Sequence, residues 1–424
     1  MDELEKDAKE YWKILGPGLT TGAADDDPSG IATYSQMGAQ RGFGLIWLSF
    51  FTYPLMGTVQ EMCARIGLAT GAGLASNIKR HYSKKVLYAC TLLLLFANVF
   101  NIGADLGAMA QGVQLVFPAF NFAFLVIFFA LLSLGLQIFI SYKGYSKYLK
   151  YLALILFAYV FSALSVKMNW GEVLQSAIMP TIQFSKDEVI LICAALGTTI
   201  SPYLFFWQTS QEVEEQILNG ESTEEQRRSM TTSKDIRHMR IDVWSGMFVS
   251  NLVMFFIIAA CAATLHQAGI TNIQTAGDAA IALRPFAGNF AFILFALGIL
   301  GTGLLAIPVL AGSASYAVSE SFGWKLGLNR KLKEARAFYG VIVVAMILGI
   351  ILNFIGLDPI KTLIYSAVLN GIISPIILFL IVRISGNGDI MGQFKNNKLS
   401  SIFGWLTVII MFVVSLTAIV FLLI

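Results

Sequence analysis

Apolar runs of about 20 residues recur along the whole chain and constrain its fold more than any other feature. A run of that length matches the thickness of a bilayer as a helix, and in lipid only helices and closed barrels satisfy every backbone polar group. Hydrophobic residues make up 56% of the sequence and charged residues only 13%. Soluble domains carry about 25% charged residues. The sequence therefore predicts an all-α polytopic membrane protein.

Eleven segments have the length and hydropathy of transmembrane helices. They are residues 14–37, 42–70, 86–116, 121–142, 147–167, 187–208, 241–265, 287–316, 336–356, 360–383 and 401–423. Residues 1–13 are polar and rich in acidic residues, which is unlike a cleavable signal peptide, and we expect them to form a cytoplasmic segment.

The basic residues are distributed unevenly between the two sides of the predicted bundle. Most of the 29 lysine and arginine residues fall on the side of the N-terminus if spans alternate in direction. The side that keeps the excess of Lys and Arg is cytoplasmic. We therefore expect a protein of the cell (plasma) membrane with a cytoplasmic N-terminus and, after eleven spans, an extracellular C-terminus.

The first predicted span is interrupted by three consecutive carboxylates, Asp25, Asp26 and Asp27, which are followed by Pro28 and Gly30. Each carboxylate at membrane depth costs roughly 2.5–3.5 kcal/mol on insertion scales. The proline and the glycine break the helix at the charge, and non-helical backbone is tolerated there only where it is buried or lines a cavity. The stretch therefore predicts a cation site with Asp27 as the first-choice ligand. Asp25 and Asp26 point in other directions and are expected to be vestibule groups or partners of other residues.

A second break, Gly197 to Tyr203, interrupts the sixth span and contains a Ser-Pro pair. Spans one and six run in opposite directions, so paired breaks indicate a five-plus-five inverted repeat, residues 14–167 and 187–383, with 401–423 added. The alternative is two unrelated proline kinks. The Thr198 carbonyl and the Ser201 hydroxyl or carbonyl are candidate oxygen ligands, although such residues can also bond only their own backbone.

The chemistry of the two breaks indicates which ion they hold. Neither break contains Met, His or Cys, the residues that favour Mn²⁺, Fe²⁺ or Zn²⁺. A site made only of oxygen suits a hard ion such as Mg²⁺ or Ca²⁺, and Mg²⁺ usually keeps several waters. The small residues Ser29, Gly30 and Gly197 leave room for a hydrated ion.

Three further polar residues at membrane depth are candidates for the cation pathway or for coupling. Asp105, in an otherwise apolar run of the third span, is either a member of a polar network or a proton acceptor. Arg336 opens the ninth span and could pair with Asp105. Asn370, in the tenth span, is expected to reach the central cavity.

The remaining ionisable and sulfur-containing residues are interpreted as structural. Glu61 and Arg65 are four residues apart on the second span, which predicts an ion pair. Glu320, near the inner end of the eighth span, is expected to be solvated. The four cysteines lie in apolar segments and are expected to be buried core residues rather than a disulfide or a metal site: Cys63, Cys90, Cys193 and Cys261.

The sequence resembles the Nramp family of divalent-metal transporters from about Gly16 to the last span. The family motif D-P-G-N corresponds to Asp27-Pro28-Ser29-Gly30, and the family motif M-P-H corresponds to Ser201-Pro202-Tyr203. The segments GLATGAGLASNI, TLIYSAVLNGIISPI and MGQFKNNKLSSIFGWL also resemble family segments. The resemblance implies a LeuT-type fold with broken helices one and six, and alternating-access uptake of a divalent cation.

The departures from the family pattern fall in the implied metal site. The motif aspartate is kept as Asp27, whereas the motif asparagine becomes Gly30 and the motif methionine becomes Ser201. The family's carbonyl ligand maps to Thr198, and its histidine to Tyr203. Loss of the thioether argues against selectivity for Mn²⁺ or Fe²⁺ and supports a site made of oxygen.

The implied proton pathway is also reduced. Asp105 keeps the family's aspartate and Arg336 matches the family's arginine, but the acidic positions around Asp105 fall on Asn98 and Ala108. Tight proton coupling is therefore not expected. The pattern is similar to the branch of the family called Nramp-related magnesium transporters.

The sequence thus predicts a secondary transporter that imports divalent cations, with Mg²⁺ as the leading substrate and Mn²⁺ as a second ion. A proton-coupled Mn²⁺/Fe²⁺ transporter of the same fold is one alternative, and a sodium-coupled symporter of small solutes is an alternative of another class. No enzymatic activity is expected, because no nucleophile–base pair or soluble domain is recognisable. The expected partners are the metal ion and the bilayer, with no cofactor, nucleic acid or obligate protein partner.

Overall fold

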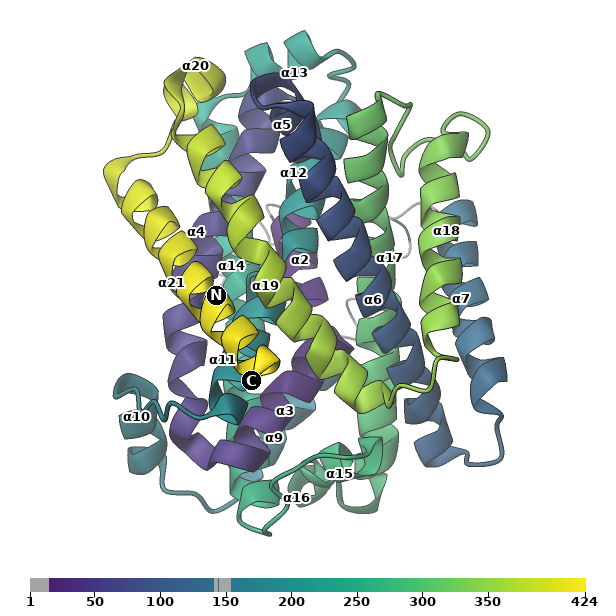
Figure 1. Ribbon diagram of the computed structural model, residues 1–424, viewed down its shortest axis with the longest axis vertical. Coiled ribbons are helices and arrows are strands. Elements are labelled where there is room, and N and C mark those ends of the chain that lie inside the picture. The colour runs from purple at the N-terminus through teal and green to yellow at the C-terminus, as the bar shows by residue number, and fades with distance from the viewer. Residues whose placement is uncertain (1–14, 141–143, 145–153) are drawn as a thin grey trace, which may run out of the picture.

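The computed structural model describes residues 15–140, 144 and 154–424, and every regular element within these ranges is helical (Figure 1). The predicted cytoplasmic segment 1–13, residues 141–142 of the predicted fourth span and residues 147–153 of the predicted fifth span lie outside the described residues. The predicted all-α fold is confirmed.

The first repeat predicted from the sequence contains these described elements: α2 (Pro17–Asp25), α3 (Pro28–Arg41), η1 (Gly42–Leu45), α4 (Trp47–Thr70), α5 (Leu74–His81), α6 (Lys84–Val116), α7 (Phe122–Phe139), η2 (Leu154–Leu156) and α9 (Phe157–Ser165). A short helix, α10 (Trp170–Ile178), follows. The second half contains these elements: α11 (Lys186–Thr199), α12 (Pro202–Leu218), α13 (Glu224–Met230), α14 (Ser233–Cys261), the π-helical turn η3 (Ala262–His266), α15 (Ala276–Ile281), α16 (Arg284–Ala287), η4 (Gly288–Phe290), α17 (Ala291–Phe322), α18 (Arg336–Leu352), α19 (Pro359–Gly386), α20 (Gly388–Met391), η5 (Gly392–Phe394) and α21 (Lys398–Leu423).

Within the described residues, seven helical stretches are long and apolar enough to cross a membrane, and α3 with α4, bent by 106°, form an eighth candidate. The helix α18 is shorter but apolar. The helices coincide with the predicted spans, apart from the segment outside the described residues. The count of eleven spans stays a prediction, because the first span is divided into two short helices and the fifth is only partly described.

Both predicted breaks are present. The first span is divided into α2 and α3, and the sixth into α11 and α12; α3 and α12 each begin with a proline. Proline suits the first position of a helix because the N–H that it lacks would have no partner there. The breaks lie in the middle of the bundle (Figure 1), where α2 packs against α14, α12 and α17, and α3 packs against α14, α19, α11 and α6.

Glycines let the central helices approach to backbone contact. A methyl group placed on Gly197 of α11 would lie 2.0 Å from the Ala367 carbonyl oxygen of α19, and one on Gly371 would lie 2.5 Å from the Cys193 carbonyl oxygen. Small residues at helix interfaces permit this close packing in membranes, where the hydrophobic effect does not drive helices together. All four cysteines are buried and free, as predicted.

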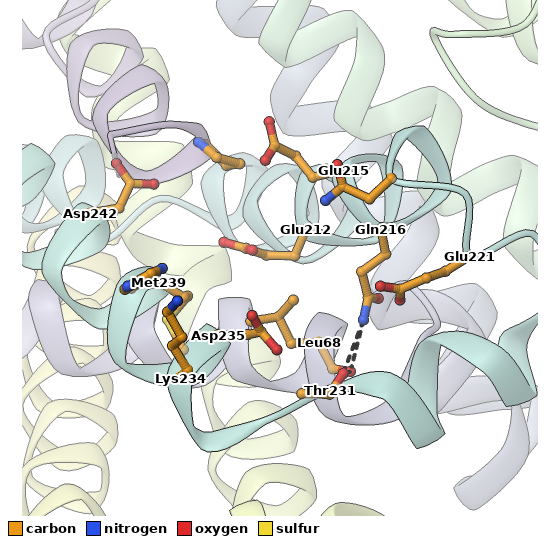
Figure 2. Close-up of a pocket in the computed structure, with 13 residues that line it drawn as sticks. Leu68, Glu212, Glu215, Gln216, Glu221, Thr231, Lys234, Asp235, Met239 and Asp242 are labelled. Atoms are coloured by element: carbon orange, nitrogen blue, oxygen red, sulfur yellow. Dashed lines mark hydrogen bonds between the residues drawn. The ribbon is translucent and has the colours of Figure 1, made fainter. Parts of the chain in front are cut away.

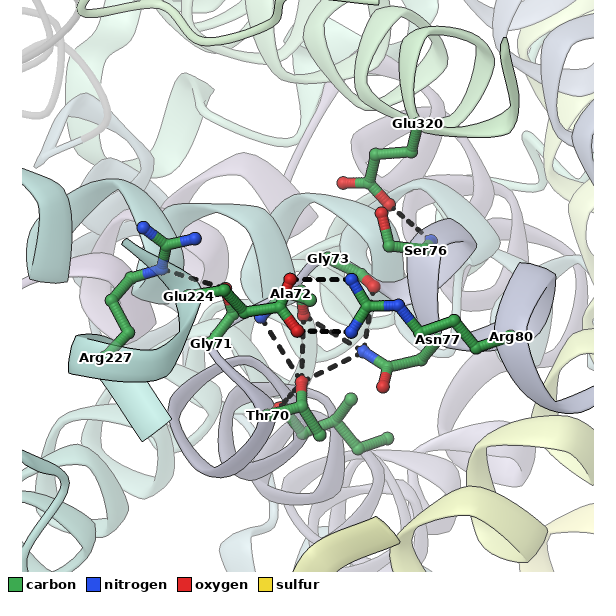
Figure 3. Close-up of polar contacts among 11 residues, drawn as sticks. Thr70, Gly71, Ala72, Gly73, Ser76, Asn77, Arg80, Glu224, Arg227 and Glu320 are labelled. Atoms are coloured by element: carbon green, nitrogen blue, oxygen red, sulfur yellow. Dashed lines mark hydrogen bonds and ion pairs between the residues drawn. The ribbon is translucent and has the colours of Figure 1, made fainter. Parts of the chain in front are cut away.

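The turn between α4 and α5 is fixed by polar contacts from distant parts of the chain (Figure 3). Asn77 donates to the carbonyl oxygens of Ala72 and Gly73, and Arg227 Nε donates to the Gly71 carbonyl at 2.8 Å. Glu320 was expected to be solvated, and this is wrong: it is buried and its carboxylate accepts from the Ser76 amide at 2.8 Å. The free amides at the start of α5 supply donors for this carboxylate.

The predicted ion pair on the second span is confirmed and belongs to a larger cluster. Arg65 and Glu61 approach to 3.5 Å, and the same carboxylate accepts from Arg240 at 2.9 Å and from the Trp244 indole at 2.8 Å. Glu61 therefore connects α4 to α14.

Candidate cation site at the two helix breaks

The first break leaves Asp27 as the N-cap of α3. Its fully buried carboxylate accepts through Oδ1 from the Ser29 hydroxyl at 2.6 Å and from the Gly30 amide at 2.8 Å. An aspartate before a helix that begins with proline is a favoured capping arrangement. The positive end of the α3 dipole therefore stabilises this charge, in addition to any cation that binds it.

The second carboxylate oxygen of Asp27 is bound by a residue that sequence reasoning did not assign to it. Asn101 of α6 donates from Nδ2 to Asp27 Oδ2 at 2.8 Å, and its Oδ1 accepts from the Ser366 hydroxyl of α19 at 2.6 Å. All three side chains are buried. A contact across 74 residues of sequence leaves no local pattern that could have revealed it.

The two breaks meet at Gly30. A methyl group on Gly30 would lie 3.2 Å from the Asp25 carbonyl oxygen and 3.2 Å from Thr198 Oγ1. The Thr198 hydroxyl is buried and has no hydrogen-bond partner. The structure thus brings together Gly30 and Thr198, which were both predicted as site residues, and the missing side chain of Gly30 lets the two breaks pack closely.

Ser201 and Tyr203 at the second break make different contacts. The Ser201 hydroxyl donates to the Gly197 carbonyl and to the Thr198 carbonyl, the latter at 2.9 Å, so it bonds its own helix as in the kink alternative. Its role as an ion ligand stays a prediction. The Tyr203 hydroxyl donates to the Ala24 carbonyl at 3.0 Å and so joins α12 to the last turn of α2.

Asp25 and Asp26 face α14 rather than Asp27's partners. The Ser250 hydroxyl donates to Asp25 Oδ2 and lies 3.4 Å from Asp26 Oδ1. Both carboxylates are buried, and Asp25 Oδ1 has no partner. This fits the expectation that they are partners of other residues, with Ser250 as the partner that the sequence did not identify.

A polar face of α6 continues past Asn101. Asp105 lies one helical turn further, and both of its carboxylate oxygens are buried without a partner. Met109 follows one turn later. A methyl group on Gly303 would lie 2.6 Å from the Met109 sulfur and 3.5 Å from the Pro28 ring, so this thioether lies close to the first break. Sequence reasoning missed Met109, although its spacing of four from Asp105 places both on one helix face.

The structure does not pair Asp105 with Arg336, and that suggestion is wrong. Gly103, just before Asp105, packs against Gly349, where a methyl group would lie 2.9 Å from the Gly349 carbonyl oxygen. Arg336 begins α18 at its other end, about 20 Å from Gly349 along the helix, and is exposed. Asn370 is buried, and neither its amide nitrogen nor its amide oxygen has a partner.

The carboxyl groups near the breaks have no basic partner. Within the described ranges, no ion pair involves Asp25, Asp26, Asp27 or Asp105, which are all buried. Among the same residues, no three acidic, histidine or cysteine side chains converge as a metal cluster would require. A buried carboxylate without a counter-charge favours a cation or a proton. The arrangement therefore suits a cation that brings part of its own water shell.

Comparison with known proteins places the chain in a family. A sequence model described as natural resistance-associated macrophage protein-like (Nramp) matches residues 18–421. The divalent metal cation transporter MntH of Erwinia tasmaniensis is 24% identical over 418 residues, which cover 96% of this chain and 94% of that protein.

Solved structures share the fold. A manganese transporter of Eremococcus coleocola, solved with an aromatic bis-isothiourea substituted compound, has a TM-score of 0.78 at 17% identity and covers 96% of this chain and 86% of that one. The inward-facing conformation of Mhp1 has a TM-score of 0.56 at 14% identity, covering 95% and 90% of the two chains. The predicted fold with broken helices one and six is confirmed. Because the family match extends over nearly the whole sequence, this chain belongs to the Nramp family.

Proposed function

We propose that this protein imports divalent metal cations across the cell membrane by alternating access, with Mg²⁺ as its leading substrate. One observation carries the proposal: at the junction of the two breaks, the buried Asp27 carboxylate and the unpartnered Thr198 hydroxyl both lie against Gly30. The family match and the divalent metal cation transporter of Erwinia tasmaniensis support metal transport rather than a sodium-coupled symporter.

The choice of Mg²⁺ follows from the ligand atoms. Asp27, Thr198 and Ser201 offer only oxygen, and Mg²⁺ prefers oxygen and keeps several waters. Asp27 already accepts three hydrogen bonds, two at Oδ1 and one at Oδ2, so only about one of its four lone-pair sites is left for direct contact with an ion. A hydrated ion could instead bind through its waters once the half-helices, which pack closely at Gly30, move apart.

Transport would follow from movement of the half-helices around the bound ion. The ion would enter from outside, bind between α3 and α11, and leave when α2 and α12 move. The membrane potential supplies about 2.3 kcal/mol per charge per 100 mV, or roughly 4.6 kcal/mol for a divalent ion. This can drive uptake with weak or no proton coupling. We place the N-terminus in the cytoplasm and the C-terminus outside, on the distribution of basic residues.

A proton-coupled Mn²⁺ or Fe²⁺ carrier of the same fold is the second candidate, and two observations favour it. The Met109 thioether lies close to Pro28, and thioether sulfur favours softer ions. Asp105 is buried with two unpartnered oxygens and could accept a proton. The structural relative from Eremococcus coleocola is itself named a manganese transporter.

Uptake into proteoliposomes separates the two candidates. Millimolar Mg²⁺ should enter and should compete with Mn²⁺; if Mn²⁺ enters while Mg²⁺ neither enters nor competes, the magnesium proposal fails.

Asp27→Ala should abolish uptake. Asp358→Ala is a matched control, because Asp358 also caps a helix that begins with proline, but it lies at the exposed start of α19. If Asp27→Ala retains transport, the ion binds elsewhere.

A further inference from the structure

The inner half of the first span begins without a capping side chain of its own. Gly16 is the N-cap of α2, and Pro17 is its first residue. The amides of Gly18 and Leu19, in the first turn, therefore need acceptors from elsewhere. Helix starts that are buried require such partners, and this one lies against α14.

Asp242 of α14 supplies those acceptors from a distant part of the sequence. Its Oδ1 accepts from the Gly16 amide at 2.8 Å and from the Leu19 amide at 3.0 Å, and its Oδ2 accepts from the Gly18 amide at 2.6 Å. Figure 2 shows the Asp242 carboxylate directed at the start of the purple helix α2. Hydrogen bonds from amides to a carboxylate at a helix N-terminus combine charge assistance with the helix dipole.

The same two helices are in backbone contact along a glycine face. A methyl group on Gly18 would lie 2.5 Å from the Val243 amide nitrogen, and one on Gly22 would lie 2.3 Å from the Gly246 carbonyl oxygen. A methyl group on Gly246 would lie 2.2 Å from the Gly18 carbonyl oxygen. No side chain can be added at these positions without separating α2 from α14.

Beside this contact lies open space. A cavity of about 640 Å³ is lined by Pro17, Asp242, Glu212 and Glu215, among others (Figure 2). Glu212 and Glu215 are also potential acceptors, but the amides of Gly16, Gly18 and Leu19 donate to Asp242. The start of α2 is thus held on one side by α14 and faces a cavity on another.

We propose that Asp242 is a positioning residue that fastens the inner half of the first span to α14, and that α2 is released from α14 when this contact is lost. The proposal rests on the proposed transport function only in assigning the contact to the transport cycle; the contact itself is independent of the ion carried. Asp242 lies outside the ion site but would control the position of the inner half-helix α2. The Asp25 carbonyl of that half-helix borders the junction of the breaks.

Thiol labelling of purified protein in nanodiscs tests this. Thr21 of α2 is fully buried, so a cysteine there (Thr21→Cys) should react with a membrane-impermeant maleimide only when α2 moves. Adding Asp242→Asn should raise the labelling rate at least five-fold, because the amide cannot accept from all three N–H groups. Gly246→Ala should act in the same direction by displacing α2. The four buried native cysteines should stay protected in both variants.

Two control variants match these changes. Asp235→Asn alters a carboxylate that caps the start of α14 itself, and Gly340→Ala adds a methyl group where no atom lies within 4 Å. Neither should change labelling of position 21. Unchanged labelling in Asp242→Asn would overturn the proposal, and so would equal exposure of the native cysteines, which would mean general unfolding. Labelling requires no transport, so this result is separate from success or failure of the uptake experiment.

Discussion

Asp27 is held by three donors, of which only Asn101 comes from another helix. Replacing Asn101 with alanine leaves Asp27 Oδ2 without its buried donor and leaves the Ser366 hydroxyl with only the Leu363 carbonyl as acceptor. A hydrogen bond to a charged group contributes about 1.5–3 kcal/mol, so misplacement of this carboxylate should weaken ion binding by roughly tenfold or more. We expect Asn101→Ala to raise the ion concentration required for half-maximal uptake, measured in proteoliposomes.

Asn98→Ala is the matched control for this prediction. Asn98 is equally buried and lies on the same helix, but its amide donates to Leu310 and Ser313 of α17. The ion dependence of uptake should stay near that of the parent protein. Equal shifts in the two variants would mean that loss of α6 packing, and not the contact with Asp27, explains the effect.

Gly30 tests the space at the junction of the breaks. Alanine at this position places a methyl group 3.2 Å from both the Asp25 carbonyl oxygen and Thr198 Oγ1, which folding can absorb by small shifts. The methyl group would crowd the junction where we propose that the ion binds, so Gly30→Ala should reduce the uptake rate about tenfold or more with little loss of thermal stability. Gly135→Ala, in open surroundings on α7, should have no effect on uptake. Normal uptake by Gly30→Ala would place the ion away from Gly30.

At the scale of elements, an ion pair joins the C-terminal end of α3 to the N-terminal end of α11. Arg41, the last residue of α3, and Glu188, in the first turn of α11, approach to 2.8 Å, and the Glu188 side chain is fully buried. Glu188→Gln removes the charge that Arg41 needs. A quarter of the Arg41 side chain is exposed and can regain water. We therefore expect the free energy of unfolding to fall by about 1.5–3 kcal/mol, measured as a lower thermal unfolding midpoint in detergent.

The pair between Arg80 and Glu224 provides the comparison. It connects α5 to α13, and both side chains are more than a third exposed. Exposed ion pairs contribute less than about 1 kcal/mol, so Glu224→Gln should lower the unfolding midpoint less than Glu188→Gln does. The reverse order would show that burial does not determine the stability of these contacts.

For the whole molecule, local chemistry predicted the fold well and the site in part. An Asp-Pro and a Ser-Pro pair inside apolar runs mark helix starts, so both breaks could be read from the sequence. The partners of the carboxylates could not, because they join helices that are distant in sequence. Asp27 to Asn101, Asp242 to the start of α2 and Glu320 to the start of α5 all depend on how the bundle packs, which no periodicity encodes.

The number of charges moved per ion is a property of the complete transport cycle. If one divalent ion crosses without protons, a potential of 100 mV supplies roughly 4.6 kcal/mol, which corresponds to an accumulation of about 2,000-fold. Coupling to one proton would move three charges and add the pH gradient to the driving force. We therefore expect uptake in proteoliposomes to follow an imposed potassium diffusion potential and to be indifferent to an imposed pH gradient.

A pH-sensitive dye inside the proteoliposomes tests whether protons enter with the metal. Asp105 is buried and neither of its carboxyl oxygens has a partner, so it is the first group to test for proton exchange. With the parent protein, the dye should stay silent while the metal enters, and Asp105→Asn should leave the voltage dependence of uptake unchanged. Acidification in step with metal entry, lost in Asp105→Asn, would instead establish the proton-coupled carrier and assign the proton to Asp105.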